Sequence, residues 1–295
     1  MKQYIIEANA LQKTYPTKPP VTALQGFSLS VERGETVGIL GPNGAGKTTF
    51  IRILLGILLP DSGEITVGDA NPVTSPKKVA RQIRFVPELP FLNSNWTLWQ
   101  NARYWFSVWE ESWIPEKVKE MLIRFHLIER ADEPLSRYSR GMQQRAGLAL
   151  ALASTAPVIV MDEPTLGLDV LGVQEMLEIL ENTKDQGKTV LFASHDMHFV
   201  EKLADRVALV AKGQVLETST TYDFRKRYGQ EYVTLRYKLP ALDEIICEQL
   251  PVDASYSDER TWRRIMKMGG TLIELRRDLQ SLDMVVGHYL QQTVY

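Results

Sequence analysis

The sequence has little of what marks secreted, disulfide-bonded or membrane-spanning proteins. Among its 295 residues there is one cysteine, Cys247, which excludes an internal disulfide and a cysteine-based zinc cluster. No apolar run approaches the ~20 residues that a helix needs to cross a bilayer. Residues 1–16 lack the basic region, apolar stretch and cleavage site of a signal peptide. We therefore expect a cytoplasmic chain in a reducing compartment, which reaches a membrane only through a partner.

An excess of charge of either sign is also missing. The 34 lysine and arginine residues nearly balance the 36 aspartate and glutamate residues, which leaves a formal net charge of -2. A nucleic-acid-binding surface or a polybasic membrane anchor would require clustered positive charge. No nucleic-acid partner is therefore expected.

What is present is the periodicity of an α/β protein with a mostly parallel sheet. Three short apolar runs are typical of strands buried on both faces, namely residues 36–40, 158–161 and 189–193. Residues 48–58 place apolar side chains at helical spacing, and residues 4–8 and 27–31 alternate like strands of an antiparallel part. Strands and helices then alternate along the chain, as in α/β folds.

The pattern divides the chain into a first domain at residues 1–218, a polar linker at 219–230 and a small α+β C-terminal domain at 231–295. Residues 89–155 or so are predicted to form a helical subdomain, in which Thr97 and Gln100 are spaced as a capping box. The C-terminal domain is predicted to contain a strand at 231–237, a helix at 241–250, a hairpin of 262–266 and 271–275 around Gly269 and Gly270, and a helix at 279–290.

A glycine-rich loop gives the strongest functional signal. The segment GPNGAGKTT matches G-x-x-x-x-G-K-[ST] between a predicted strand and a predicted helix, which is the context that this motif requires. Its residues are Gly41, Pro42, Asn43, Gly44, Ala45, Gly46, Lys47, Thr48 and Thr49. Backbone N–H groups and the helix dipole would hold nucleotide phosphates, with Lys47 on the β and γ phosphates and Thr48 on Mg²⁺. The alternative is a glycine turn whose lysine is merely exposed.

Two adjacent acids follow the buried run at residues 158–161. They stand at the carboxyl end of a strand, where open α/β sheets bind ligands. Asp162 can hold Mg²⁺ while Glu163 polarises the attacking water, unless both are only a solvated strand end. His195 follows the next buried strand and is expected along the same edge, although a lone histidine there is more often a neutral, hydrogen-bonded residue.

A further segment, YSRGM at residues 138–142, extends the pattern beyond a phosphate loop. With the elements above, all in order over residues 4–217, the chain resembles the ATP-binding subunits of ABC transporters, whose signature reads LSGGQ. The resemblance implies an ATPase of the P-loop NTPase fold with ATP and Mg²⁺. It makes Glu163 the catalytic glutamate, His195 the switch histidine and Tyr15 the aromatic residue that stacks on adenine, although Tyr15 could be ordinary strand-edge packing.

The resemblance also implies that two ATP-binding subunits sandwich the nucleotides, in a homo- or heterodimer. Residues of the signature and the following D-loop would contact the ATP held by the opposite subunit, and they are Ser139, Arg140, Gly141, Met142 and Asp169. Ser139 can cap the helix that starts near Gly141, which aims amide groups and a dipole at an anion. The plain alternative for this segment is a helix cap and nothing else.

Two positions depart from the family pattern. Glu88, in the run FVPELP, stands where a glutamine contacts Mg²⁺ and the transmembrane partner, so Glu88 is a poorer counterpart of that ligand. Arg140 replaces the first glycine of the signature pair. Both forms resemble the subfamily that serves ABC-2 type exporters, which implies separate transmembrane permease subunits, a peripheral location on the cytoplasmic face of the membrane, and export.

The helical segment is rich in tryptophan, and in the family this insertion receives the membrane subunit. Its tryptophans are Trp96, Trp99, Trp105, Trp109 and Trp113. Aromatic side chains anchor interfaces, but at helical spacing they equally build a core. Two other functions stay open: a soluble ABC-type ATPase that acts on ribosomes or DNA, and an ATP-binding scaffold with an inactive site.

Overall fold

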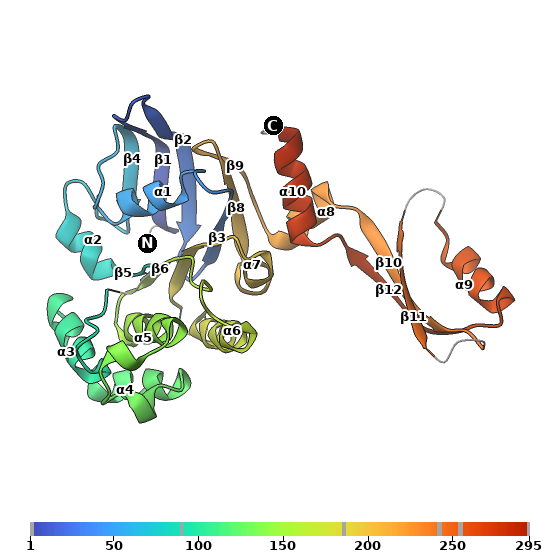
Figure 1. The fold of residues 1–295 in the computed structure, drawn as a ribbon. Coiled ribbons are helices and arrows are strands. Elements are labelled where there is room, and N and C mark those ends of the chain that lie inside the picture. Colours follow the sequence, from blue (N-terminus) through green and yellow to red (C-terminus); the bar gives the residue numbers. More distant parts are fainter. Residues whose placement is uncertain (1–2, 89–90, 185–186, 241–243, 253–255, 294–295) are drawn as a thin grey trace. The chain divides into compact units, whose positions relative to one another are not determined.

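The computed structural model describes residues 3–88, 91–184, 187–240, 244–252 and 256–293. Its residues fall into two compact units, residues 1–219 with two sheets and residues 220–295 with one (Figure 1). The start of the helix predicted at 241–250 lies at residues 241–243, outside the described residues. The helix α8, Thr221–Tyr228, occupies the segment predicted as the linker.

The first unit is built on a six-stranded sheet with the order β5-β6-β7-β3-β8-β9. Neighbouring strands are parallel except for the last pair, β8 and β9. The strands are β3 (Thr36–Leu40), β5 (Ile83–Val86), β6 (Val158–Asp162), β7 (Thr189–Ala193), β8 (Arg206–Ala211) and β9 (Gln214–Ser219). The three predicted buried strands are confirmed, and β3 and β7 are buried at every position because layers cover both faces.

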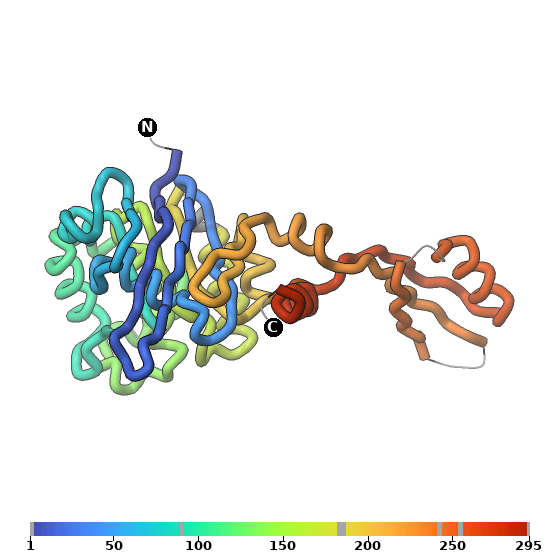
Figure 2. Tube along the Cα trace, turned by 90° about the horizontal axis from the view of Figure 1, so that it is seen from above, coloured from blue at the N-terminus to red at the C-terminus, as the bar shows by residue number. Residues whose placement is uncertain are grey.

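A three-stranded antiparallel sheet, in the order β2-β1-β4, forms a second layer of this unit. Its strands are β1 (Tyr4–Tyr15), β2 (Val21–Glu32) and β4 (Ser62–Val67), and Figure 2 shows the long β1–β2 hairpin in blue. One core of buried apolar residues joins both sheets and the helix α1, Lys47–Leu54. In this core Phe27 of β2 stacks on Phe50 of α1, with ring centroids 4.5 Å apart.

Helices complete the first unit. They are α2 (Pro76–Gln82), α3 (Leu98–Val108), α4 (Pro115–Arg124), α5 (Arg140–Ala153), α6 (Val170–Lys184) and α7 (Met197–Leu203). Figure 1 shows α5, α6 and α7 in a row along one side of the six-stranded sheet. The predicted capping box opens α3, because Thr97 Oγ1 accepts from the Gln100 backbone N–H and the Gln100 side chain accepts from the Thr97 N–H.

The helix α1 is shorter than predicted. The apolar spacing predicted a helix to residue 58, but α1 ends at Leu54. Gly56 adopts a positive φ of 71°, its N–H donates to the Ile53 carbonyl, and the Ile57 N–H donates to the Arg52 carbonyl. These bonds are a Schellman motif, which satisfies the last carbonyls and stops the helix despite apolar residues beyond it.

A buried ion pair ties β5 to the helical segment. Arg84 of β5 is 1% exposed, pairs with the carboxylate of Glu111 and stacks over the Trp109 ring at 4.5 Å. Glu111 also accepts the Thr155 backbone N–H at 2.8 Å. Burial lowers the pKa of Arg84, while Glu111 opposes that shift. Burial likewise lowers the pKa of Lys188 to about 8, again against the attraction of Glu111. One carboxylate thus faces two cations, the buried Arg84 and the half-buried Lys188.

The second unit is a three-stranded antiparallel sheet with helices. It contains α8, β10 (Glu231–Lys238), β11 (Ile245–Pro251), α9 (Asp258–Lys267), β12 (Thr271–Leu279) and α10 (Leu282–Thr293), with the strand order β11-β10-β12. The predicted strand at 231–237 is confirmed as β10, and the predicted last helix is α10. Ile265 of α9 packs against Val233, Leu235 and Tyr237 of β10 in a small core.

Two predictions for this unit are wrong. Residues 245–251 form a strand rather than the end of a helix, and half-buried Ile246, Glu248 and Leu250 alternate with exposed neighbours. Residues 262–266 belong to α9 rather than to a hairpin strand. Ser257 caps this helix, and the Gly269–Gly270 pair ends it in a second Schellman motif, with the Gly270 N–H donating to the Ile265 carbonyl.

Candidate active site

The glycine loop between β3 and α1 requires glycine for steric reasons at two of its positions. A Cβ on Gly41 would lie 2.1 Å from the carbonyl oxygen of Val210, and one on Gly46 would lie 2.5 Å from that of Ala23. Gly46, the residue that precedes α1, also has a φ of 107°, where other residues are strained. The loop therefore folds closely over the ends of β2 and β8 and leads directly into the first turn of α1.

Lys47 is buried against this loop. Its Nζ donates to the carbonyl of Gly41 at 2.5 Å and to that of Pro42 at 3.2 Å. Burial lowers the pKa of Lys47, and the nearby carboxylates of Glu163 and Asp162 oppose that shift. The Lys47 ammonium is thus held inside the loop, within the electrostatic reach of both acids.

Asp162 ends β6 beside α1. Thr48 Oγ1 donates to Asp162 Oδ2 at 3.2 Å. Burial raises the pKa of Asp162, and the negative charges of Glu163 and Glu88 add to the shift, while Thr48 and Lys47 oppose it. A hydroxyl and a carboxylate side by side are oxygen donors of the kind that Mg²⁺ prefers, and Mg²⁺ sites with substrate phosphates need just one or two carboxylates. Among the described residues there is no cage of three or more metal-ligating side chains.

Glu163 is linked to His195 across the edge of the sheet. Glu163 Oε2 lies 2.8 Å from His195 Nδ1 and also accepts the His195 backbone N–H at 3.3 Å. The Glu163 side chain is 16% exposed and that of His195 is 64% exposed. Glu163 has a φ of 49°, an unusual conformation for a residue with a side chain. Such backbone strain is common at functional sites.

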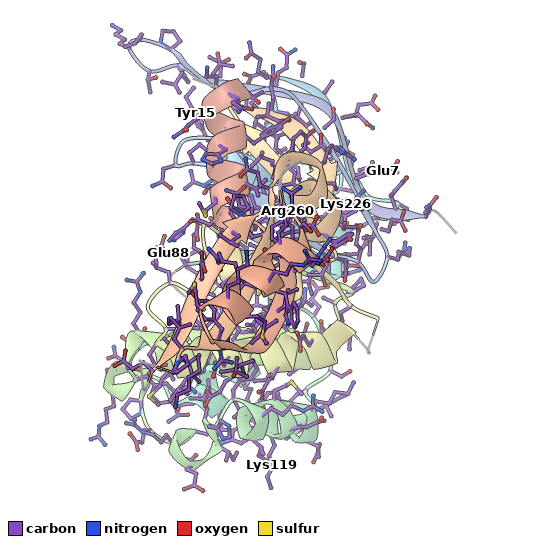
Figure 3. All side chains as sticks on the ribbon, turned by 90° about the vertical axis from the view of Figure 1, so that its right-hand side faces the viewer. Glu7, Tyr15, Glu88, Lys119, Lys226 and Arg260 are labelled. Atoms are coloured by element: carbon purple, nitrogen blue, oxygen red, sulfur yellow. The ribbon has the colours of Figure 1, made fainter. Side chains whose placement is uncertain are left out.

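These residues surround one pocket of about 370 Å³, which we call the nucleotide pocket after the ligand that the sequence predicts. Its lining includes residues 42–49 together with Tyr15, Val21, Ala23, Glu88, Asp162 and Glu163, and Figure 3 labels Tyr15 and Glu88. The Tyr15 hydroxyl lies 3.3 Å from Thr49 Oγ1. The structure thus brings the predicted loop, the aromatic residue and three of the four predicted acids together, with His195 bonded to Glu163.

The remaining predicted residues except Met142 line a second pocket of about 360 Å³, which we call the signature pocket. Its lining includes Ser139, Arg140, Gly141, Gly167, Leu168 and Asp169. Ser139 Oγ accepts the Met142 N–H at 3.2 Å and caps α5, and Asp169 Oδ1 accepts the Gly172 N–H at 2.8 Å in the first turn of α6. Among the described residues the two pockets share no lining residue.

One contact and one pocket were missed by reasoning from the sequence. Arg140 Nη2 donates to Glu88 Oε1 at 3.0 Å, so the two departures from the family pattern form an ion pair. The available signal for this ion pair was that Glu88 and Arg140 carry opposite charges at two positions where the family pattern has uncharged residues. An apolar pocket of about 250 Å³ is the second feature, and its lining includes Ile57, Phe85, Phe91, Trp105, Trp109 and Leu150. Phe91 is 69% exposed at this pocket, and both tryptophans are half-buried.

The fold and the nucleotide pocket define a P-loop ATPase, and comparison with known proteins gives the family. The family described as ABC transporter matches residues 24–166. An uncharacterized ABC transporter ATP-binding protein of Nostoc sp. is 32% identical over 95% of this chain and 88% of its own length. The SkfA peptide export ATP-binding protein SkfE of Bacillus subtilis is 34% identical over 72% of this chain and 88% of its own length.

Solved structures agree with this. A dimeric ATP-binding cassette in a post-hydrolysis state with ADP and phosphate has a TM-score of 0.65 and 25% identity, over 73% of this chain and 98% of that cassette. The chain belongs to the ABC transporter family, as an ATP-binding subunit that hydrolyses ATP. Within the described residues, every helix is too short or too polar to cross a membrane.

Proposed function

We propose that this ATPase drives a separate transmembrane permease from the cytoplasmic face of a membrane, and that each of its ATP sites is shared by two copies of the chain. The observation that carries this proposal is the separation of the two pockets. The phosphate loop and the acids line one pocket, whereas the capped end of α5 lines the other. A single chain therefore offers two half-sites, which two chains can complete.

In the nucleotide pocket the loop and Lys47 hold the phosphates. The amide groups of residues 42–49 and the positive end of α1 favour anions, and Lys47 meets the β and γ phosphates. Tyr15 stacks on the adenine at the outer wall. Thr48 and Asp162, with Glu88 nearby, would hold Mg²⁺, which when bound neutralises charge on the phosphates.

Glu163 is assigned to activate the attacking water. Its carboxylate lines the pocket next to Asp162 and accepts two contacts from His195, which fix its direction. A carboxylate held in this way can orient a water and accept its proton. His195 is placed to sense the terminal phosphate, because its ring is largely exposed while its Nδ1 stays on Glu163.

In the signature pocket Ser139 and Gly141 present the start of α5, and Met142 of the same turn donates its N–H to Ser139 Oγ. Because Ser139 caps this helix, its next amide groups and its dipole point toward an incoming anion. Gly141 packs closely against Leu168, because a Cβ there would lie 3.1 Å from Leu168 Cδ2. Asp169 fixes the loop before α6. We assign the partner's ATP as the anion that closes this half-site.

The apolar pocket next to α3 is assigned to the permease. Its wall combines half-buried Trp105 and Trp109 with exposed Phe91, an arrangement typical of an interface anchor site. It also includes Val86 and Pro87, which directly precede Glu88 of the nucleotide pocket. Movement of a permease segment in this pocket would therefore shift Val86 and Pro87, and with them the adjacent Glu88 of the nucleotide pocket. Export as the direction is supported by the relative named for peptide export.

The first test concerns Lys47. Lys47→Ala is expected to weaken ATP binding by at least ~10-fold, because the variant loses a charge-assisted contact to the phosphates. The measurement is calorimetric titration of ATP, and Lys119→Ala on the exposed surface of α4 is the matched control. Unchanged affinity in the Lys47 variant would refute the assignment of the loop.

The second test concerns the apolar pocket. Phe91→Asp is expected to abolish recovery of the membrane partner with the tagged chain, because a charge replaces an exposed apolar anchor, while ATP binding by the purified chain stays unchanged. Ile123→Asp, at a residue of α4 that is 51% exposed, is the matched control. Equal recovery of the partner with both variants would rule this pocket out as the docking site.

A further inference from the structure

The Glu88–Arg140 ion pair joins the two pockets of one chain. Glu88 lines the nucleotide pocket and Arg140 lines the signature pocket, and their side chains meet at 3.0 Å. Arg140 is the first residue of α5, next to the Ser139 cap. A change in the position of either side chain can therefore pass from one pocket to the other.

The surroundings hold this pair in position. Gln144, which is 1% exposed and lies one turn after Arg140, donates to the Pro87 carbonyl at 3.2 Å. The stem of Arg140 crosses Gly167, where an added Cβ would come within 2.9 Å of the Arg140 Cδ. Both side chains of the pair are nevertheless about half exposed, at 47% and 50%. Exposed ion pairs are weak, so a stronger anion can displace Glu88 without disturbing the backbone around it.

We propose that Arg140 exchanges Glu88 for the terminal phosphate of ATP held by a second copy of this chain. The inference rests on the proposed two-copy site. It adds that Glu88 and the terminal phosphate compete for Arg140. A terminal phosphate carries more negative charge than a carboxylate and accepts the planar guanidinium through two oxygens. Arg140 lines the pocket that would face this phosphate. Glu88 therefore holds Arg140 inside its own chain until ATP and the second copy are both present.

This competition gives the two members of the pair opposite effects on dimer formation. Glu88→Gln removes the competing anion and leaves Arg140 available, so ATP should bring two copies together more easily. Arg140→Gln removes the group that binds the phosphate, so ATP should bring them together less easily. If the ion pair only stabilised the fold, replacing either member would shift ATP-dependent dimer formation in the same direction.

The experiment uses the full chain with Glu163→Gln, so that ATP is bound but turned over slowly. Sedimentation gives the fraction of dimer as ATP concentration rises. Adding Glu88→Gln should lower the ATP concentration for half-dimerisation by about two- to fivefold, the scale of an exposed ion pair. Adding Arg140→Gln should raise it by about tenfold or more, the scale of one charge-assisted hydrogen bond. Arg81→Gln, which breaks the exposed Arg81–Glu110 pair, should leave it unchanged.

Two results would overturn the exchange: shifts of the two variants in the same direction, or no shift in either variant. ATP titration of each variant by calorimetry separates these results from a damaged nucleotide pocket. If the Glu163→Gln parent stays monomeric at saturating ATP, the two-copy site itself fails, and the exchange fails with it. That outcome is recognisable because the parent shows it before Glu88 or Arg140 is changed.

Discussion

Replacing Glu163 with glutamine is expected to slow ATP hydrolysis by at least ~10²-fold, the scale for one positioned acid–base group. Glutamine keeps the size of the side chain and one acceptor oxygen, but it cannot take a proton from the attacking water. Because Lys47, the glycine loop and Asp162 are untouched, ATP affinity should stay the same. Steady-state release of phosphate measures the turnover, and calorimetric titration measures the affinity.

The control for Glu163 is an acid outside the pocket. Glu120 of α4 pairs with Arg124, and its side chain is 54% exposed, so Glu120→Gln should hydrolyse ATP like the unmodified chain. The comparison separates loss of a catalytic group from loss of one negative charge. Turnover near normal in Glu163→Gln would remove Glu163 from the catalytic role and leave Asp162 or His195 as the candidates to examine.

Removing the Glu111 side chain is expected to produce a large loss of stability. Glu111→Ala leaves Arg84 buried without its counter-charge, and it also removes the carboxylate that faces Lys188. Breaking a buried pair from one side typically costs about 3–5 kcal/mol in the free energy of unfolding. Urea denaturation followed by tryptophan fluorescence reports on this region, since all tryptophans except Trp262 lie between residues 96 and 113.

Glu110 supplies the matched control for this measurement. It is the adjacent residue, its pair with Arg81 is 64–65% exposed on both sides, and Glu110→Ala should change stability by ~1 kcal/mol or less. A loss in Glu111→Ala no larger than in Glu110→Ala would show that the buried pair contributes little.

Local rules were sufficient to predict which residues lie together around the nucleotide pocket. The glycine loop, the acids after β6 and the histidine after β7 each follow a strand of a parallel sheet, and parallel strands bring their carboxyl ends to one edge. The contacts that sequence reasoning missed join residues far apart in the chain. Arg140 and Glu88 are 52 positions apart, and no periodicity relates them.

Glycines mark where prediction of the elements was wrong. Gly56 and Gly269 both adopt positive φ at the end of a helix, yet Gly56 lies within an apolar helical pattern and Gly269 belongs to a pair typical of hairpin turns. A glycine with positive φ can end a helix or form a hairpin turn. The two cases differ in whether the following N–H groups bond to the last carbonyls of a helix. For residues 245–251 the difference in burial between alternate side chains is small, because Ile246, Glu248 and Leu250 are only half-buried in a small sheet.

The most direct test of the account is to identify what the tagged chain carries out of its own membranes. Membranes are extracted in mild detergent, the chain is captured, and partners present in stoichiometric amount are identified by mass. A polytopic, apolar membrane protein is the expected result, since the chain supplies the ATPase and an apolar pocket that we propose as the docking site. A ribosome, DNA, or capture of no partner would contradict the transporter role and favour a soluble ATPase.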